Sequence, residues 1–363
     1  MGDDFLAEQD FDLAIIGASF AGIACACAAA ARGVSVVLID RKGDPGEKLH
    51  TTGIIVRDAA EGYEGFRYLP GKLGRRIDAV RLYAPDLHSV RLVSPGYYFL
   101  ATDTPNLMRH LASQTGREGV ALRMSTAFRN AERRADRFEL DCGMTARYLV
   151  GADGPRSRVA ETFGLDRNTR FLFGVEHEYR DGVLPEPDSL HCFIDATLAP
   201  GYIGWALQGV GCVQLGLARR HPGGTDITAF REKVRTVLPL PDDPPVGVRA
   251  GLIPCGGTLK RVALPGVLLV GDAAGLVSPV TAGGIHTAVR HGEAAGIAIA
   301  DYLKGNRPEP AQWFPQTYPR FRLKRALRWG YDRFQADWVF NLMLNSWPMR
   351  RAAEIVYFHR RRS

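Results

Sequence analysis

The amino-terminal part of the chain joins two short apolar runs through an alanine-rich segment. The mostly apolar run Phe11 to Ile16 has the length of a buried strand. Gly17 to Gly22 then opens an alanine-rich helix that extends to about Ala31, and Ser35 to Asp40 has the pattern of a second strand. The pattern therefore predicts a strand, a glycine turn, a helix and a second strand.

The rest of the chain shows two further kinds of pattern. Arg76 to Leu100 and Phe171 to Gly216 alternate apolar and polar side chains, which is typical of an antiparallel sheet. A hairpin is expected from Ala127 to Asp141, and an apolar strand follows it. Another apolar strand begins after Gly266, and an apolar helix is expected from Gly284 through Ala300.

Length and composition agree with a folded protein of more than one domain. The 363 residues are 46% hydrophobic, enough for a large core and for two or three domains. The six cysteines are scattered without metal-ligand or disulfide-scaffold spacing, so a reducing cytoplasm is expected. The acidic stretch Met1 to Asp12 does not have the pattern of a secretion signal, and no apolar run has transmembrane length.

The positive charge is concentrated at the carboxyl terminus. Residues 319–363 carry eleven Lys and Arg against three acidic residues, so the net charge of +7 lies in this tail and argues against nucleic acid as a partner. The tail also contains Trp329, Trp338, Trp347, Tyr357 and Phe358. We expect a helical cap whose apolar face packs on the body. The alternative is peripheral contact with a membrane headgroup region, where aromatic rings and arginine occur together.

The first glycine turn has the properties of a dinucleotide-binding segment. The first glycine permits the tight turn and the last permits close helix packing, while free N–H groups at the helix start face a pyrophosphate. Asp40, at the end of the second strand, is expected to accept from a ribose hydroxyl. The alternative is a purely structural turn. The expected contacts in the turn are Gly17, Ala18, Ser19, Phe20, Ala21 and Gly22, with Ser19 in place of the usual middle glycine.

Two later segments favour FAD over NAD. The run Tyr148 to Arg158 places Asp153 beside a glycine at a strand end, and Gly266 to Gly275 contains the pair Gly271-Asp272. Pro279, Gly283 and Gly284 then precede the apolar helix. With these motifs in this order, the chain resembles the group A flavoprotein monooxygenase superfamily, and within it the geranylgeranyl reductase branch, over roughly residues 11 to 305.

The resemblance implies a fold and a domain organisation. The expected fold class is α/β, with a Rossmann-type FAD-binding domain similar to glutathione reductase and p-hydroxybenzoate hydroxylase, an antiparallel-sheet substrate domain and carboxyl-terminal helices. The expected domains are 1–75, 101–170 and 246–305 for a discontinuous FAD-binding domain, 76–100 and 171–245 for the substrate domain, and 306–363 for the helical region.

The resemblance also implies individual roles. Asp272 would bind a ribityl hydroxyl, and the helix after Gly284 would direct its N–H groups at the flavin, where negative charge accumulates on reduction. Asp153 would lie near the pyrophosphate, and Ala127, expected in a strand, would touch adenine through its backbone. The remaining implied FAD contacts are Arg41, Lys48, Gly151, Gly271, Pro279, Gly283 and Ile285.

Two positions depart from the pattern of the family. Thr104 precedes Leu107 where the family usually has an arginine that contacts the flavin side chain, so Arg41, Lys48 or Arg109 is expected to replace it. The loop Lys48 to Gly53 has no cysteine, although the reductase branch often carries one there. Double-bond reduction is therefore one of several expectations.

The predicted substrate side offers few acid–base groups. Tyr202, Trp205 and Thr52 are the expected pocket residues, the first two from an aromatic strand pair similar to that of the family. The alternative is that both aromatics are plain core residues. His50, in the loop beside the flavin, is the expected catalytic acid or base, and His286 is the second choice.

The leading functional prediction is an FAD-dependent oxidoreductase that reduces double bonds of a lipophilic, isoprenoid-like substrate. The alternatives are an FAD-dependent monooxygenase of specialised metabolism, a halogenase, or a flavin-binding protein without turnover. No second strand–glycine–helix unit is found for a resident nicotinamide. The expected electron donor is therefore transiently bound NAD(P)H, or a reduced protein partner such as a reductase or ferredoxin.

Overall fold

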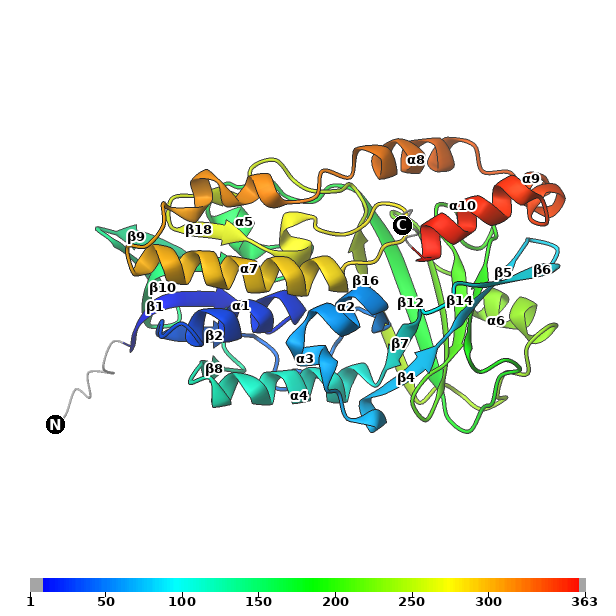
Figure 1. Cartoon of the computed structure of the whole chain (residues 1–363), viewed down its shortest axis with the longest axis horizontal. Coiled ribbons are helices and arrows are strands. Elements are labelled where there is room, and N and C mark those ends of the chain that lie inside the picture. Colours follow the sequence, from blue (N-terminus) through cyan, green and yellow to red (C-terminus); the bar gives the residue numbers. More distant parts are fainter. Residues whose placement is uncertain (1–8, 359–363) are drawn as a thin grey trace.

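The computed structural model describes residues 9–358. Two large sheets lie one after the other along the long axis, and helices near the carboxyl terminus run along one side of both (Figure 1). The expected FAD-binding domain starts at residue 1 and the expected helical region ends at residue 363. Residues 1–8 and 359–363 of these assignments lie outside the described residues.

The first sheet is built on the predicted strand–turn–helix–strand unit. Strand β1 pairs in parallel with β2 and with β11, and β11 pairs in parallel with β18. The resulting order is β17-β18-β11-β1-β2-β8, with the β9–β10 hairpin attached to β11. The strands are β1 (Gln9–Ile16), β2 (Val36–Ile39), β8 (Ala121–Arg123), β9 (Ala131–Arg134), β10 (Arg137–Leu140), β11 (Met144–Gly151), β17 (Ala263–Leu264) and β18 (Val267–Leu269).

Two helices, α1 (Phe20–Ala30) and α7 (Ile285–Leu303), pack against each other beside this sheet (Figure 1). A Cβ added to Gly292 of α7 would lie 2.3 Å from the carbonyl oxygen of Ala21, and one added to Gly296 would lie 2.3 Å from that of Cys25. Glycine at these two positions therefore lets the helices meet backbone to backbone. The alanine-rich composition of α1 serves the same close contact.

The second sheet has the order β16-β12-β15-β14-β13-β5-β6. Its neighbouring strands are antiparallel, as predicted, except that β5 and β13 run parallel because a long connection separates them in the chain. Its strands are β5 (Ala79–Tyr83), β6 (Ser89–Val93), β12 (Phe171–Tyr179), β13 (Ser189–Phe193), β14 (Gly204–Gln208), β15 (Val213–Arg220) and β16 (Gly247–Pro254).

Three boundaries differ from the sequence pattern. Strand β16 pairs with β12 in the second sheet, although it follows the expected boundary at residue 246. The ends of the 76–100 region contribute to a separate small sheet of β3 (Ile54–Val56), β7 (Phe99–Thr102) and β4 (Gly74–Ile77). The prediction that Ala127 lies in a strand is wrong: the hairpin begins at Ala131, because the Asp141 carboxylate holds the N–H groups of Arg129 and Asn130.

The remaining helices surround the sheets. Polar caps start three of them, since the side chains of Asp103, Ser157 and Asp226 accept from backbone N–H groups in the first turns of α4, α5 and α6. These helices are α2 (Arg57–Gly62), α3 (Glu64–Arg67), α4 (Thr104–Arg117), α5 (Arg158–Thr162), α6 (Ile227–Arg235), α8 (Arg322–Arg333), α9 (Asp337–Met343) and α10 (Trp347–Phe358), with 3-10 turns at Gly71–Leu73, Gly271–Ala274, Pro310–Gln312 and Phe314–Thr317.

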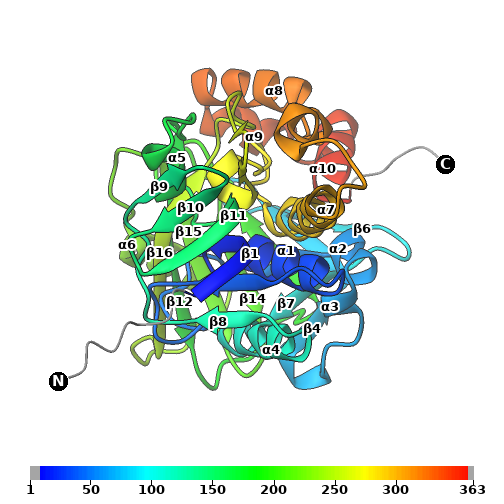
Figure 2. The same cartoon turned by 90° about the vertical axis from the view of Figure 1, so that its left-hand side faces the viewer.

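The predicted helical cap is right for α10 and wrong for α8. Phe358 of α10 is buried against Tyr97 and Phe99, which lie just before and at the start of β7. In α8, Arg328 is the buried residue, whereas Leu323 is 73% exposed and Leu327 is 53% exposed. Figure 2 shows α8 on the side of the molecule opposite to α4. The apolar side chains of α8 therefore face away from the body, because its inner face is bonded to the body through polar groups.

Candidate active site

The turn between β1 and α1 requires glycine at both ends. Gly17 has φ +108°, and a Cβ there would lie 2.4 Å from the carbonyl oxygen of Ala152. A Cβ on Gly22 would lie 2.0 Å from the carbonyl oxygen of Gly17. The turn therefore packs closely against the end of β11. The first N–H groups of α1 lie at the carboxyl ends of β1 and β11.

Ser19 has a structural role that explains why a side chain is tolerated here. Its hydroxyl donates to the carbonyl oxygen of Ala152 at 2.9 Å and accepts from the N–H of Gly22 at 3.3 Å as the cap of α1. The side chain is thus turned toward β11, which keeps the opening of the turn clear.

Asp40 is buried beside this turn. One carboxylate oxygen accepts from the N–H of Ala18 at 2.8 Å and the other from the N–H of Lys42 at 2.9 Å. The carbonyl oxygen of Asp40 also accepts from the N–H of Thr126, which brings the exposed Ala127 loop next to it. The structure therefore brings together Gly17, Asp40 and Ala127, far apart in sequence.

Asp153 lies on the opposite side of the turn. Its Oδ2 accepts from the N–H groups of Arg158 and Val159 at 2.6 and 3.1 Å, while Oδ1 is buried and has no hydrogen-bond partner in residues 9–358. Burial raises the pKa of this carboxyl, and the hydrogen bonds oppose the shift. A Cβ on Gly17 would lie 3.0 Å from the Asp153 Cα, so the acid adjoins the glycine turn.

Asp272 is the least compensated acid of the region. Burial alone raises the pKa of its carboxyl to about 6, and no hydrogen bond to this carboxylate forms within the described part of the chain. A Cβ added to Gly284, the residue that caps α7, would lie 3.3 Å from Asp272 Oδ1. The carboxylate therefore faces the first turn of α7.

Asn168 joins the two acidic loops, and sequence reasoning missed it. Its Nδ2 donates to the carbonyl oxygen of Pro155 at 3.1 Å and to that of Asp272 at 2.9 Å. No sequence pattern marks this asparagine, since its partners follow from how the two loops approach each other.

These residues fit FAD. The glycine turn at α1 leaves a clear helix start for a pyrophosphate. A half-buried carboxylate without a partner in residues 9–358 at Asp272 suits a sugar-alcohol hydroxyl, and the start of α7 suits the electron-rich end of a flavin. Asp40 and Asp272 would thus hold opposite ends of the cofactor.

The three expected substitutes for the missing arginine lie differently. Arg41 and Lys48 are exposed, and Lys48 has φ +47°. Arg109 is already paired, because its Nε lies 2.9 Å from both carboxylate oxygens of Asp44. This pair holds the pKa of Asp44 below its usual value. The Arg109 side chain therefore binds the 41–53 loop through Asp44.

The loop with His50 rests on strand β16. His50 is exposed, and its Nδ1 lies 2.5 Å from the carbonyl oxygen of Ala250. A carbonyl can only accept, so Nδ1 carries the hydrogen and Nε2 is the ring atom left for other partners. His286 lies in the first turn of α7, where burial lowers its pKa.

A buried polar cluster under this loop was not predicted. Glu176 of β12 is 3% exposed; its Oε2 accepts from the indole N–H of Trp205 at 3.0 Å, and its Oε1 lies 3.2 Å from Arg249. The Thr52 side chain also bonds to Glu176. Burial raises the pKa of Glu176, while Arg249, Trp205 and Thr52 oppose the shift. Two expected pocket residues, Thr52 and Trp205, thus both bond to Glu176, which no sequence motif singled out.

Trp205 and Tyr202 have different surroundings. The Trp205 indole is buried over Gly216 of β15, where a Cβ would lie 2.1 Å from the ring. The Tyr202 hydroxyl donates to the carbonyl oxygen of Thr281 at 2.5 Å, in the loop between Asp272 and α7. Both aromatics therefore have fixed positions, Tyr202 against the predicted flavin loop and Trp205 against Glu176.

Comparisons with known proteins agree with this geometry. Residues 12–154 match the family model described as FAD dependent oxidoreductase. The chain is 28% identical over 331 residues to digeranylgeranylglycerophospholipid reductase 2 of Methanosphaera stadtmanae, covering 82% of this chain and 81% of that protein. It is 29% identical to the protein of the same name from Methanopyrus kandleri, with 82% and 78% covered.

Solved structures share the fold over nearly the full chain. A geranylgeranyl bacteriochlorophyll reductase-like protein from Thermoplasma acidophilum superposes with a TM-score of 0.83 at 16% identity, covering 97% of this chain and 98% of that one. The anhydrotetracycline hydroxylase OxyS of Streptomyces rimosus superposes with a TM-score of 0.68 at 16% identity, covering 96% and 76%.

Fold and site together define a flavoenzyme with a Rossmann-type cofactor domain. More specifically, the chain is an FAD-dependent oxidoreductase with a geranylgeranyl reductase-like fold, as the sequence motifs predicted.

Proposed function

We propose that the protein reduces carbon–carbon double bonds of a lipophilic, isoprenoid-like substrate. The observation that carries the proposal is the similarity to digeranylgeranylglycerophospholipid reductases, which extends over about four-fifths of both chains.

Reduction of a double bond places a hydride on one carbon and a proton on the other. Bound FAD supplies the hydride chemistry, so the chain has to supply the proton. We assign this proton to Nε2 of His50 in the imidazolium form of the ring, because Nδ1–H is held by the Ala250 carbonyl and Nε2 carries the second proton of the exposed ring; the neutral Nδ1–H tautomer remains after transfer.

The Glu176 cluster fixes the walls of the proposed substrate site. Arg249 bonds to Glu176 and to the carbonyl oxygen of Thr51, so it ties the His50 loop to β12 and β16. Glu176 in turn holds Trp205 and Thr52. We propose that these residues orient the pocket and that none of them exchanges a proton with substrate.

Electrons are proposed to come from NAD(P)H that binds transiently, or from a reduced protein partner such as a reductase or ferredoxin. The two sources differ in a direct test, since NADPH alone would reduce the flavin in the first case and would leave it oxidised in the second.

We also propose that the protein meets its substrate at a lipid surface through α8 and α9. Within residues 9–358 no helix has the length and apolar character to cross a bilayer. Much of the exposed apolar surface nevertheless gathers in this segment, which also carries Arg322, Arg325 and Arg333. Exposed apolar and basic side chains in one segment suit an anionic headgroup region. The exposed apolar residues of this segment are Leu323, Leu327, Trp329, Phe334, Trp338, Leu342 and Met343.

Sedimentation with vesicles tests the surface contact. Replacing Leu323 and Leu327 by serine removes apolar area from α8 and is expected to weaken binding to phosphatidylglycerol vesicles. Val183→Ser is the matched control, because Val183 is equally exposed but lies in another part of the protein. Equal binding of the double variant and the control would overturn the proposed contact.

The reaction is tested by anaerobic reduction of the FAD-loaded protein with NADH or NADPH, followed by addition of a prenyl alkene such as a geranylgeranyl glycerophospholipid. Oxidation of the flavin with formation of the saturated lipid is expected. If prenyl alkenes leave the reduced protein unchanged, the reductase proposal fails.

The second function is monooxygenation. The observation that favours it is the loop Lys48 to Gly53, which lacks the cysteine that the reductase branch often carries. Oxygen uptake coupled to substrate addition, with oxygen incorporated into product, would identify this reaction.

A further inference from the structure

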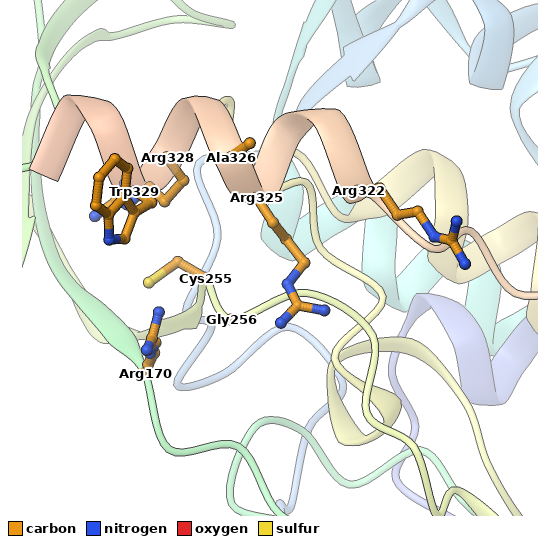
Figure 3. Close-up of a pocket in the computed structure, with 8 residues that line it drawn as sticks. All are labelled: Arg170, Cys255, Gly256, Arg322, Arg325, Ala326, Arg328 and Trp329. Carbon is orange, nitrogen blue, oxygen red and sulfur yellow. The ribbon is translucent and has the colours of Figure 1, made fainter.

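A cavity of about 350 Å³ lies between α8 and the loop that follows β16. Figure 3 shows Arg325 extending from α8 toward the loop at Gly256, and Arg170, just before β12, extending toward Cys255. Arg322, Arg328 and Trp329 also line the cavity. Arg322, Arg325 and Trp329 share one face of α8 because they are spaced by three and four residues.

The cavity is lined by arginine side chains and, over the described range 9–358, by no acidic side chain. Arg170, Arg322 and Arg325 form no ion pair and no side-chain hydrogen bond in the described part of the chain. Arg328 is 6% exposed and pairs with Asp332 at 3.0 Å, but its Nη2 is buried without a hydrogen-bond partner among residues 9–358. Guanidinium groups gathered in this way repel each other unless an anion joins them.

The position of Arg325 is fixed by neighbours. A Cβ added to Gly257 would lie 3.2 Å from Arg325 Cδ and 3.6 Å from Pro279 Cγ, so the arginine stem lies next to the loop that leads to α7. On the adjoining face of α8, Lys324 donates to the Ser278 hydroxyl at 3.3 Å. The cavity therefore adjoins the predicted flavin loop and is not an isolated surface hollow.

We propose that this cavity binds a phosphate group through Arg170 and Arg325, with Arg322 and Arg328 contributing charge. Guanidinium groups match phosphate oxygens in bidentate geometry, and the cavity volume accommodates a phosphate ester. The chemistry fits a lipid headgroup or a soluble phosphate compound. The exposed Leu323 and Leu327 favour the lipid, since they add apolar surface to the helix that lines the cavity. The site would bind phosphate whichever reaction the flavin catalyses.

Calorimetric titration of the FAD-loaded protein with inorganic phosphate at constant ionic strength tests the site. The double variant R170A/R325A is expected to bind phosphate at least about tenfold more weakly, because two charge-assisted contacts are lost. Arg350→Ala, which removes an exposed arginine of α10 outside the cavity, is expected to bind as the unmodified protein does. Unchanged phosphate binding by the double variant would overturn the proposal.

Two further measurements identify the source of the phosphate and guard against misfolding. R170K/R325K preserves charge but not bidentate geometry, and it is expected to bind phosphate with intermediate strength while retaining FAD. Vesicles with and without phosphatidylglycerol, and NADPH, are then compared as ligands. Loss of phosphatidylglycerol-dependent sedimentation in R170A/R325A assigns a lipid headgroup, whereas weakened NADPH binding with unchanged sedimentation assigns a soluble phosphate. None of these readouts requires turnover, so their failure is distinct from failure of the proposed reaction.

Discussion

Asn168 donates a 2.9 Å hydrogen bond to the carbonyl oxygen of Asp272 and thereby holds the loop before α7 against the loop after β11. Both loops carry an acid assigned to FAD. The amide side chain of Asn168 thus links the two loops beyond the point where the pairing of β11 with β18 ends.

Asn168→Ala is expected to weaken FAD binding about tenfold, because the loss of both hydrogen bonds frees the Asp272 loop. Titration of the FAD-free protein with FAD, followed by flavin fluorescence, measures the change. Asn345→Ala, at an exposed site outside the loops, serves as control. If Asn168→Ala binds FAD as tightly as this control, the positioning role is wrong.

Asp272→Asn is expected to have opposite effects on cofactor and fold. The folded pKa of about 6 exceeds the ordinary value of 3.8, so the buried charge destabilises the FAD-free protein increasingly as pH rises through this window. At pH 7 the substitution should stabilise the FAD-free protein by up to about 3 kcal/mol, and by less at pH 5. Urea unfolding at both pH values measures this gain.

The same substitution, and Asp272→Ala, should lower FAD occupancy after purification, since an acceptor for a ribityl hydroxyl is lost. Full retention of FAD by Asp272→Ala would contradict the role assigned to this acid, whatever the unfolding measurements show.

Gly22→Ala should abolish FAD binding and destabilise the fold, because the new methyl group would lie 2.0 Å from the carbonyl oxygen of Gly17. Gly116→Ala in α4 is the matched control. Its Cβ meets no atom within 4 Å, so alanine should stabilise the helix by up to about 1 kcal/mol. The unfolding temperatures of the two variants should therefore change in opposite directions, and FAD content should fall only in Gly22→Ala.

Glu176→Gln removes the charged partner of Arg249 in a buried site but also relieves the burial that raises the pKa of Glu176, so the net destabilisation should be about 1 kcal/mol and at most about 3 kcal/mol. Arg249 keeps Glu178, which limits the loss. Glu61→Gln disrupts the exposed pair with Arg57 and should change stability by less than about 1 kcal/mol. Chemical unfolding compares the two, and a shift of the Trp205 emission only in Glu176→Gln would locate the change.

His50→Gln should slow the proposed alkene reduction about a hundredfold while FAD content stays constant, because a proton donor is lost. His88→Gln, on the β5–β6 turn, should leave the rate unchanged. A His50 variant that turns over at the full rate would transfer the proton-donor role to another group.

Local patterns predicted much of the fold. The glycine turn, the strand to Asp40 and the helix after Gly284 were predictable because each depends on neighbours a few residues away. Glu176 and Arg249 lie 73 residues apart, and their pairing follows from strand register in the second sheet. The outward direction of Leu323 and Leu327 was mispredicted, because an amphipathic pattern gives the faces of a helix but not which face meets the body.

The contact of α1 with α7 sets the spacing of the cofactor site. Gly292 abuts Ala21 and Gly296 abuts Cys25, so the helices run in the same direction, and α7 begins about six residues, or roughly 9 Å, ahead of α1. The contacts at both glycines are backbone atoms, so side-chain rotamers cannot alter this offset. The two helix starts therefore keep a fixed separation along the helix axes, and the proposed FAD site would place the pyrophosphate at one start and the ring at the other.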